Sequence, residues 1–478
     1  MKLLSIEINN YRSIKSISIP IEALTDETFT YGLIGVNEAG KSSILKALAL
    51  KENVIKLSQK DFRDPKENVS VSFYYNVSVA EADAFREQLG KTDAELVNQL
   101  SNLSAMAAKY SFDSASLTKK TTYTVSRDDG SNLELPPDTV LSGRVHASIF
   151  WTAEDKYLIS HPIELAAFAS NPEDVSVPLR NCFLLANISN IKERIDQLAG
   201  DSTEIELLQT ELGERVTEHI KTVWPGHPIK ITFLITNGFI NFHVKDINAK
   251  GKAKTADQRS DGFKQFVSFL LTISAQNKNE QLADALLLLD EPETHLHPQA
   301  QEYLLAEVKK ISRNERNNVV IFATHSNFMI DKEDLSRNYR ITKEDEGTVV
   351  ARLSKSTSSY SGVNFEVFGI VSHDYHNELY AKLHSLYQLE DESAIDREKI
   401  LSFDDGFFHQ QHKQKKTKPW RSKTNAATLS TYVRNCINHA DNGNTFTSDE
   451  LLESIKFMRS LTIPTHALPA AAVAKPKI

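Results

Sequence analysis

A glycine-rich segment near the start of the chain has the residue types needed to hold a phosphate chain. It reads Gly35-Val36-Asn37-Glu38-Ala39-Gly40-Lys41-Ser42, which fits the pattern GxxxxGK[ST], between an apolar stretch and the helix-like SSILKALAL. In such a loop the backbone N–H groups face the phosphates, Lys41 reaches the β- and γ-phosphates, and the Ser42 hydroxyl ligates Mg²⁺. The segment therefore predicts a nucleotide site formed by Asn37, Glu38, Ala39, Gly40, Lys41, Ser42 and Ser43.

Two adjacent carboxylates end a later apolar run. Residues 285–289 are long enough for a buried parallel strand, and Asp290 and Glu291 follow directly. Buried carboxylates are costly unless a metal ion or a proton compensates their charge. We therefore expect Asp290 to hold Mg²⁺ together with Ser42, and Glu291 to act as the general base on an attacking water.

Two shorter motifs flank this acidic strand. Ser260-Asp261-Gly262 precedes the helix-like FKQFVSFLLTIS, and the apolar VVIFA ends in Thr324-His325-Ser326. Taken alone, each is weak, because Ser-Asp-Gly is a common helix start and a single histidine at a strand end is often structural. Their order gives them weight: phosphate loop, long insertion, Ser-x-Gly turn, acidic strand, histidine.

This order resembles the ABC-type heads of the SMC, RecF and OLD (overcoming lysogenization defect) families over roughly residues 1–75 and 225–345. The opening Asn10-Tyr11-Arg12 and the segment 290–298 match these families as well, whereas Glu38 stands where many relatives have glycine. The resemblance implies ATP bound between two heads. It also implies the roles of four further groups: Ser260, Asp261 and Gly262 contacting the γ-phosphate held by the other subunit, catalytic His325 at the γ-phosphate, Arg12 at the nucleotide, and Gln59 or Asp61 near Mg²⁺ or water.

His295 and His297 offer a rival interpretation, since alternate residues on a strand can chelate a metal. The resemblance instead places them in the subunit-facing loop that follows the catalytic glutamate. We favour the loop.

Periodicity predicts the elements that position these residues. Alternating apolar positions indicate strands at 3–8 and 15–21, and Asn237-Gly238 between two apolar runs indicates a hairpin over 229–245. Helix-like patterns cover 80–110, 145–170, 183–222, 376–389 and 448–461. We predict an α/β, ABC-type P-loop NTPase head with a mixed sheet, divided as follows: N-terminal lobe 1–79, mostly helical insertion 80–228, C-terminal lobe 229–345, helical C-terminal domain 346–462 and disordered tail 463–478.

Composition narrows the class of protein. The net charge of −8 argues against a uniformly basic nucleic-acid-coating protein, although residues 413–423 (KQKKTKPWRSK) are locally basic and suit either an acidic partner or a solvated loop. No apolar run reaches membrane-spanning length, so we expect a cytoplasmic protein without membrane attachment. Two cysteines fit a reducing compartment.

The output of the ATPase depends on the remaining segments. OLD-family nucleases carry a Toprim domain after the histidine strand, which opens with a Glu-Gly pair and later shows Asp-x-Asp, and after Ile330 no comparable apolar strand ends in such a motif. The chain thus resembles ATPase subunits of bacterial anti-phage defence, such as the Septu-type subunit that works with an HNH nuclease or ATPases found with retrons. We expect a head-to-head dimer or higher even oligomer that gates a nuclease effector, with nucleic acid as a further candidate partner.

Two other functions stay open. Arg434, Asn435 and His439 fit the R-x4-6-H pattern of HEPN ribonucleases, in which arginine stabilises a phosphorane and histidine acts as acid or base. A capping and packing arrangement at a helix end explains the same residues. A RecF-like DNA-repair ATPase also fits the head.

Overall fold

The computed structural model describes most of the chain. It covers residues 1–53, 55–90, 103–127, 130–135, 145–159, 162–198, 200–223, 229–246, 254–255, 261–276, 282–354, 358–389, 399–420, 422–439, 441 and 443–462. These residues fall into two compact units: Met1–Asp331 with Ser336–Leu353, and Lys332–Leu335 with the described residues from Ser354 onward. Within this part of the chain, no helix has both the length and the apolar character that crossing a bilayer requires.

The central sheet of the first unit has the strand order β16-β15-β3-β14-β13-β8. Its strands are β3 (Thr30–Ile34), β8 (Ala147–Thr152), β13 (Ala285–Asp290), β14 (Val319–Thr324), β15 (Asn338–Glu344) and β16 (Gly347–Arg352). All neighbours are parallel except β16, which folds back antiparallel on β15. The sheet is therefore mixed, as the sequence predicts.

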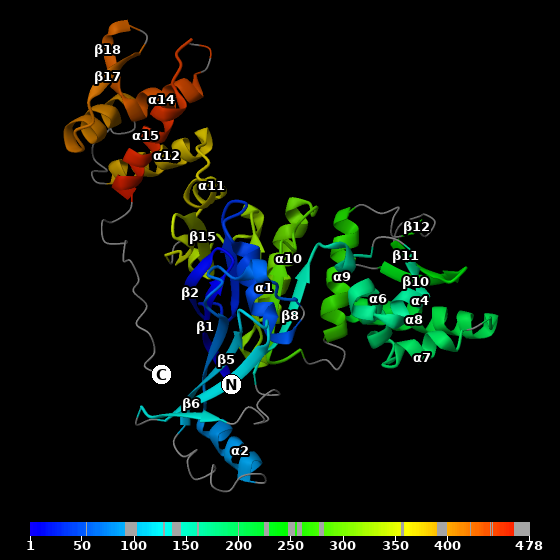
Figure 1. The fold of residues 1–478 in the computed structure, drawn as a ribbon. Helices are drawn as coiled ribbons and strands as arrows, with labels where there is room; N and C mark the ends of the chain where they lie inside the picture. Colours follow the sequence, from blue (N-terminus) through cyan, green and yellow to red (C-terminus); the bar gives the residue numbers. More distant parts are fainter. Residues whose placement is uncertain are drawn as a thin grey trace. The chain divides into compact units, whose positions relative to one another are not determined.

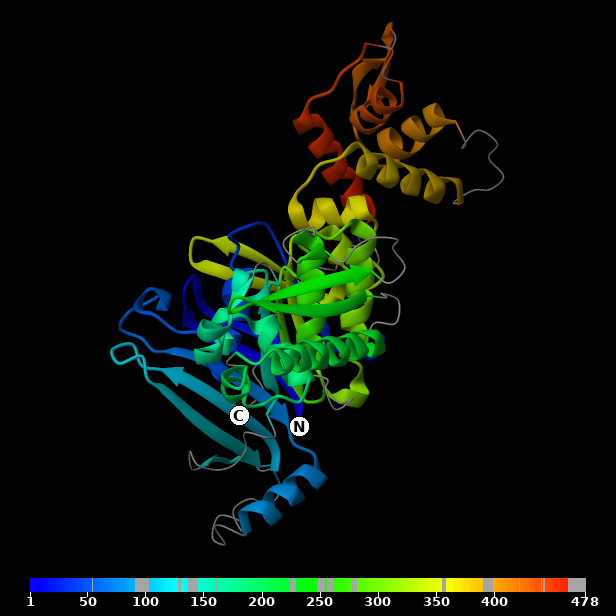
Figure 2. The same cartoon turned by 90° about the vertical axis from the view of Figure 1, so that its right-hand side faces the viewer.

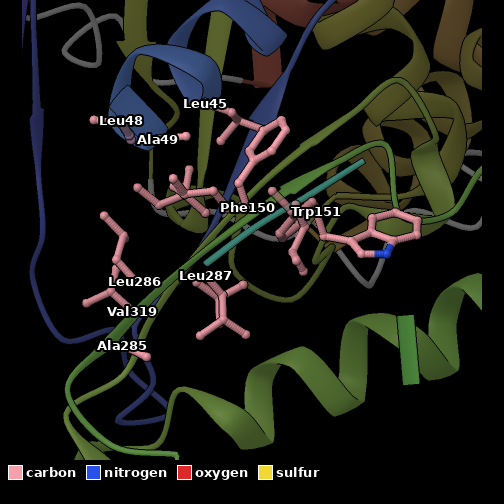
Figure 3. Close-up of a cluster of buried hydrophobic side chains, with 14 of the residues drawn as sticks. Leu45, Leu48, Ala49, Phe150, Trp151, Ala285, Leu286, Leu287 and Val319 are labelled. Carbon is pink, nitrogen blue, oxygen red and sulfur yellow. The ribbon is translucent and has the colours of Figure 1, made fainter. Parts of the chain in front are cut away.

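The helix α1 (Lys41–Ala49) packs on this sheet and fixes the loop that precedes it. Leu45, Leu48 and Ala49 of α1 gather with apolar side chains of β8, β13 and β14 in one buried cluster (Figure 3). Continuous apolar runs such as ALLLL suit strands that are covered on both faces. This core holds the carboxyl ends of the parallel strands beside the amino end of α1.

A second, antiparallel sheet has the order β2-β1-β4-β5-β6-β7. The predicted opening hairpin is present as β1 (Lys2–Tyr11) and β2 (Ile14–Pro20), and β4 (Val69–Asn76) pairs with β1. The remaining strands are β5 (Leu103–Phe112), β6 (Lys119–Arg127) and β7 (Asn132–Leu135). Figure 2 shows β5 and β6 as long cyan strands.

The prediction of a mostly helical segment over 80–228 is wrong for its first half. Among the described residues from 79 to 144, only α2 (Val79–Gly90) is helical, and β8 replaces a helix predicted from residue 145. The segment LSAMAAKYSF contains helix-favouring alanines, yet β5 pairs with β4 on one side and β6 on the other. These long-range backbone hydrogen bonds outweigh a weak local preference.

The second half of this segment is helical. It contains the short strand β9 (Ile163–Glu164) and the helices α4 (Leu165–Ser170), α5 (Pro172–Val175), α6 (Val177–Leu185), α7 (Ile191–Asp196) and α8 (Ser202–Val223). The predicted hairpin follows as β10 (Ile229–Thr236) and β11 (Phe239–Asp246), with α8 packed on β10 (Figure 1). A short strand β12 (Lys254–Thr255) pairs with β11. The helices α9 (Asp261–Gln276) and α10 (Pro298–Ile311) complete the unit.

The second unit is helical apart from one hairpin. Its helices are α11 (Tyr360–Phe368), α12 (His373–Leu389), α13 (Ile400–Phe403), a π-helical turn (Asp404–Gln411), α14 (Leu429–Asn438) and α15 (Ser448–Thr462). The basic segment 413–423 forms most of the hairpin β17 (Lys416–Trp420) and β18 (Ser422–Thr428), where Lys416 pairs with Asp404 at 3.1 Å. The predicted boundary at 345/346 is also wrong, because β16 belongs to the first unit. The tail 463–478 lies outside the described residues.

Candidate nucleotide-binding site

The predicted phosphate loop connects β3 to α1. Gly40 has a φ of 109°, and a Cβ there would lie 2.4 Å from Oγ1 of Thr348, so the position requires glycine. The Lys41 ammonium is buried and donates to the carbonyls of Gly35 at 2.8 Å and Val36 at 3.0 Å. Burial lowers the pKa of Lys41, against the opposing effect of nearby carboxylates. The loop thus presents a desolvated cation where a phosphate chain would approach.

Ser42 and Asp290 meet as the sequence predicts. The Ser42 hydroxyl donates to Oδ1 of Asp290 at 2.8 Å, although the two residues come from α1 and β13. Burial raises the pKa of Asp290, while the hydrogen bond from Ser42 opposes that rise. A hydroxyl and a buried carboxylate are hard oxygen donors of the kind that Mg²⁺ takes alongside phosphate oxygens and water. These two side chains fit a magnesium ion bound with ATP.

Glu291 and His325 lie together just beyond the ends of neighbouring strands. Because β13 and β14 are parallel, the Glu291 N–H donates to the Ala323 carbonyl at 3.0 Å, and Oε1 of Glu291 lies 3.3 Å from Nδ1 of His325. The Glu291 backbone has a φ of 49°, a left-handed conformation that a non-glycine residue adopts at some cost. The two predicted catalytic residues are therefore held side by side.

The backbone of Glu291 is fixed by two donors that the sequence does not single out. Its carbonyl accepts from Nε2 of Gln265 on α9 at 3.1 Å and from the Thr294 hydroxyl at 3.0 Å. Gln265 is on the helix that begins at the predicted Ser-x-Gly turn. The catalytic loop is thus joined directly to that helix.

Glu293 is a second carboxyl that sequence reasoning missed. It is 2% exposed, its Oε1 accepts from the Thr324 hydroxyl, and burial raises its pKa to about 7. The sequence shows only two glutamates separated by Pro292, and this pattern does not indicate that Glu293 is buried. Its position two residues after Glu291 makes it a support for the catalytic loop.

Arg12 and Asp61 form a tight pair beside the loop. Nε of Arg12 donates to Oδ1 of Asp61 at 2.7 Å, and Oδ2 of Asp61 accepts from the backbone and hydroxyl of Ser58. The amide of Gln59 instead donates to the Ser114 carbonyl at 2.8 Å. Arg12 is therefore held in place by Asp61, while a magnesium contact from Gln59 stays a prediction.

The carboxyl end of β8 lies next to Asp290, one of the two residues that fit the magnesium ion. Thr152 lies opposite Asp290 in the parallel register, and Glu154 pairs with Lys46 of α1 at 3.2 Å. Sequence reasoning assigned this segment to a helix and so missed it. The apolar, aromatic run SIFW before Thr152 is the signal that predicts a buried strand.

Comparison with known proteins decides the family. The AAA ATPase domain family matches residues 1–139 and 143–330 of this chain. The chain belongs to this family of ATPases. Old nuclease of Escherichia phage P2 is 23% identical over 381 residues, which are 74% of this chain and 61% of Old nuclease. An uncharacterized protein of Methanocaldococcus jannaschii is 28% identical over 123 residues, 25% of this chain and 31% of that protein. This chain thus spans less than two thirds of either relative.

Solved SMC heads are similar at lower identity. The SMC head bound to the C-terminal winged-helix domain of ScpA has a TM-score of 0.41 at 16% identity and covers 74% of this chain and 98% of that chain. The SMC head domain from Thermotoga maritima has a TM-score of 0.37 at 11% identity and covers 74% and 100%. The prediction of an ATPase related to OLD proteins is confirmed by the family match and by Old nuclease.

The remaining predicted residues of this AAA ATPase are placed only in part. Ser260 lies outside the described residues, and Asp261 and Gly262 begin α9. His295 has a φ of 62° and His297 caps α10, so both lie in a turn rather than on a strand. Across the described residues, no group of three His, Cys, Asp or Glu side chains is arranged to hold a metal ion.

The HEPN-like residues lie on and just after α14. Arg434 donates to Oδ1 of Asn435 at 3.0 Å, its guanidinium lies 5.9 Å from the ring centre of Tyr380, and His439 caps the helix. These contacts match the packing and capping interpretation. A ribonuclease role for Arg434, Asn435 and His439 stays a prediction.

Proposed function

We propose that this AAA ATPase binds ATP and Mg²⁺ between two copies of its head, and that nucleotide-driven dimerisation gates a partner nuclease in bacterial anti-phage defence. The convergence of Ser42, Asp290, Glu291 and His325 at one edge of the central sheet supports the ATP-binding part. Similarity to a phage-encoded nuclease supports the link to phage biology. The partner nuclease and the gating rest on the sequence resemblance to defence ATPases.

Each side chain has a role in phosphoryl transfer. Lys41 neutralises the β- and γ-phosphates, and Ser42 with Asp290 holds the ion, which supplies further charge neutralisation when bound. Glu291 accepts a proton from the attacking water, and His325 beside it orients the water or the γ-phosphate. Because phosphoryl transfer depends mostly on positioning and electrostatics, these groups are sufficient for the cis half of the site.

Exposure of the catalytic pair is the observation that favours a site shared by two copies. The Glu291 side chain is 34% exposed and the His325 side chain is 49% exposed. Catalysis benefits when a closing surface excludes bulk water from the reacting groups. A second head that presents its residues 260–262 to this face would supply such a surface.

Glu291→Gln tests the shared site. The variant keeps the shape of the side chain but removes the base, so the rate of ATP hydrolysis should fall by about 10²- to 10⁴-fold. Because ATP stays intact, sedimentation velocity with ATP and Mg²⁺ should show a stable dimer. Lys41→Ala should show no ATP-dependent dimer, and Lys66→Ala, at an exposed lysine, should behave as wild type. A monomeric Glu291→Gln protein saturated with ATP would rule out the shared site.

A phage infection assay tests the defence role separately. Cells that carry this chain with its neighbouring genes should reduce the efficiency of plating, and Lys41→Ala should abolish that reduction while Lys66→Ala retains it. His439→Ala separates the ribonuclease alternative. Protection lost with His439→Ala in a normally folded protein would favour the HEPN-like function over a partner nuclease.

A further inference from the structure

Three consecutive residues of the loop after β14 each contact the segment that follows β13. The pairs are Thr324 with Glu293, His325 with Glu291, and Ser326 with Gln301. In the third pair the Ser326 hydroxyl donates to Oε1 of Gln301 at 2.5 Å. The two loops are therefore joined on both sides of His325, as well as through its ring.

The imidazole of His325 depends on such support. Its side chain is 49% exposed, so packing alone does not fix the ring. Nδ1 faces Glu291, which leaves Nε2 to face a γ-phosphate. The residues on either side of His325 are less exposed, because Thr324 is buried and Ser326 is half-buried. The position of the ring thus depends on the contacts that hold the backbone at these two neighbours.

The contacts of Gln301 have a fixed direction. The Leu296 carbonyl, 2.8 Å away, can only accept, so Nε2 of Gln301 faces it and Oε1 faces Ser326. The Ser326 hydroxyl gives its single proton to Gln301 and accepts from the Phe328 N–H at 3.2 Å. An apolar side chain in place of Gln301 would therefore leave the Ser326 hydroxyl without its acceptor.

The helix that carries Gln301 is well placed to hold the histidine loop. Gln301 lies in the first turn of α10, and α10 packs against the short 3₁₀ turn Asn327–Met329 that follows His325. The bond to Leu296 closes the chain just before α10 and is sufficient for a structural role. The bond to Ser326 adds nothing to that closure, because Ser326 follows a different strand. Its effect falls on the loop that contains His325.

We propose that Gln301 is a positioning residue for ATP hydrolysis, which acts on His325 through Ser326. By holding the backbone after His325, it keeps Nδ1 against Glu291 and directs Nε2 to the γ-phosphate. This role rests on the functions proposed for Glu291 and His325. Gln301 does not itself contact the nucleotide, so its loss slows the chemical step and leaves ATP binding at the phosphate loop intact.

Steady-state hydrolysis by the full chain tests the role. Gln301→Met keeps the length of the side chain and removes both hydrogen bonds, so kcat should fall about tenfold through misplacement of the imidazole. KM should change by less than about twofold, because binding of the ground state is unaffected. Ser326→Ala leaves the bond between Gln301 and Leu296 in place and should cause the same loss. Gln299→Met, at an exposed glutamine of α10, is the matched control and should hydrolyse ATP as wild type does.

The same substitution in a His325→Ala background separates positioning from a general structural effect. His325→Ala should by itself lower kcat by about 10²-fold. Adding Gln301→Met should then change kcat by less than about twofold, since no imidazole remains to be positioned. A structural defect would instead lower the rate about tenfold again. Single-turnover reactions with the protein in excess over ATP measure these slow rates.

Two results overturn the inference. One is a Gln301→Met protein with the kcat of wild type while His325→Ala is slow, and the other is a full tenfold loss from Gln301→Met in the His325→Ala background. A His325→Ala protein with the kcat of wild type instead refutes the role proposed for His325 itself. Melting temperatures check the folding of every variant, and Ser326→Ala carries both comparisons if Gln301→Met does not fold.

Discussion

Glu293 makes the stability of the first unit depend on pH in a way that can be calculated. Burial raises the pKa of this carboxyl to about 7 from an ordinary value of 4.5. Below pH 4.5 the group is protonated in both the folded and the unfolded chain. Between these values the unfolded chain releases the proton and the folded chain keeps it, which favours unfolding. Stability is therefore lost as the pH rises through 7.

The size of this loss follows from the two pKa values. Between pH 5 and pH 8, linkage predicts that Glu293 lowers the free energy of unfolding by about 2.5 kcal/mol. Glu293→Gln removes the titration. Its amide oxygen still accepts from Thr324, and the variant resembles the protonated acid. At pH 8 the variant should therefore be more stable than wild type by about 3 kcal/mol.

Urea denaturation at both pH values measures the effect. The change from pH 5 to pH 8 is determined for wild type and for Glu293→Gln, and the difference between the two changes cancels every other titrating group. Glu206→Gln, at an exposed glutamate of α8, controls for the loss of a charge. A difference below about 0.5 kcal/mol, or a Glu293→Gln protein that is less stable at pH 8, would refute this account of the buried carboxyl.

Two further substitutions test the framework around the site. Gly347→Ala should destabilise the protein by about 2–3 kcal/mol and weaken ATP binding, because a Cβ would lie 2.3 Å from the Ser13 carbonyl oxygen. Gly238→Ala, at positive φ but in open space, is the control and should cost about 1 kcal/mol. Equal losses of stability in the two variants would contradict the steric argument. Arg337→Met should cost about 3 kcal/mol in urea denaturation, because Asp26 and Asp331 lose their buried guanidinium partner and keep only the more exposed Lys309. Arg352→Met, whose partner is exposed, should cost less than about 1 kcal/mol, and a larger loss there would contradict the ranking by burial.

The parts of the site that the sequence predicts are those encoded in short segments. The phosphate loop needs glycine at Gly40 and a cation at Lys41, and both requirements are visible within eight residues. The run that ends in Asp290 indicates a buried strand through its length and composition alone. The contact between Ser42 and Asp290 then follows, because the helix begins at the edge of the sheet where the strand ends.

The parts that the sequence does not predict depend on partners far away in the chain. Strand β8 becomes a neighbour of Asp290 only through its pairing with β13, and no local pattern specifies that order of strands in the sheet. The burial of Glu293 depends on Thr324 at the end of β14. Gln59 illustrates the converse, since its residue type suited a magnesium contact but its amide donates to Ser114.

The mistaken boundary at 345/346 is informative about how the nucleotide loop is held. A cut there would separate β15 from β16 and remove Thr348, whose hydroxyl lies 2.7 Å from that of Ser13 and donates to the Ala39 carbonyl at 3.2 Å. Gly347 allows this close approach, since any side chain would collide with the Ser13 carbonyl. The turns at Ser13 and at Gly347-Thr348, which are distant from the nucleotide loop in the sequence, thus support it. Strand β16 thus contacts the nucleotide loop through its first residues and leads to Leu353, where this part of the first unit ends.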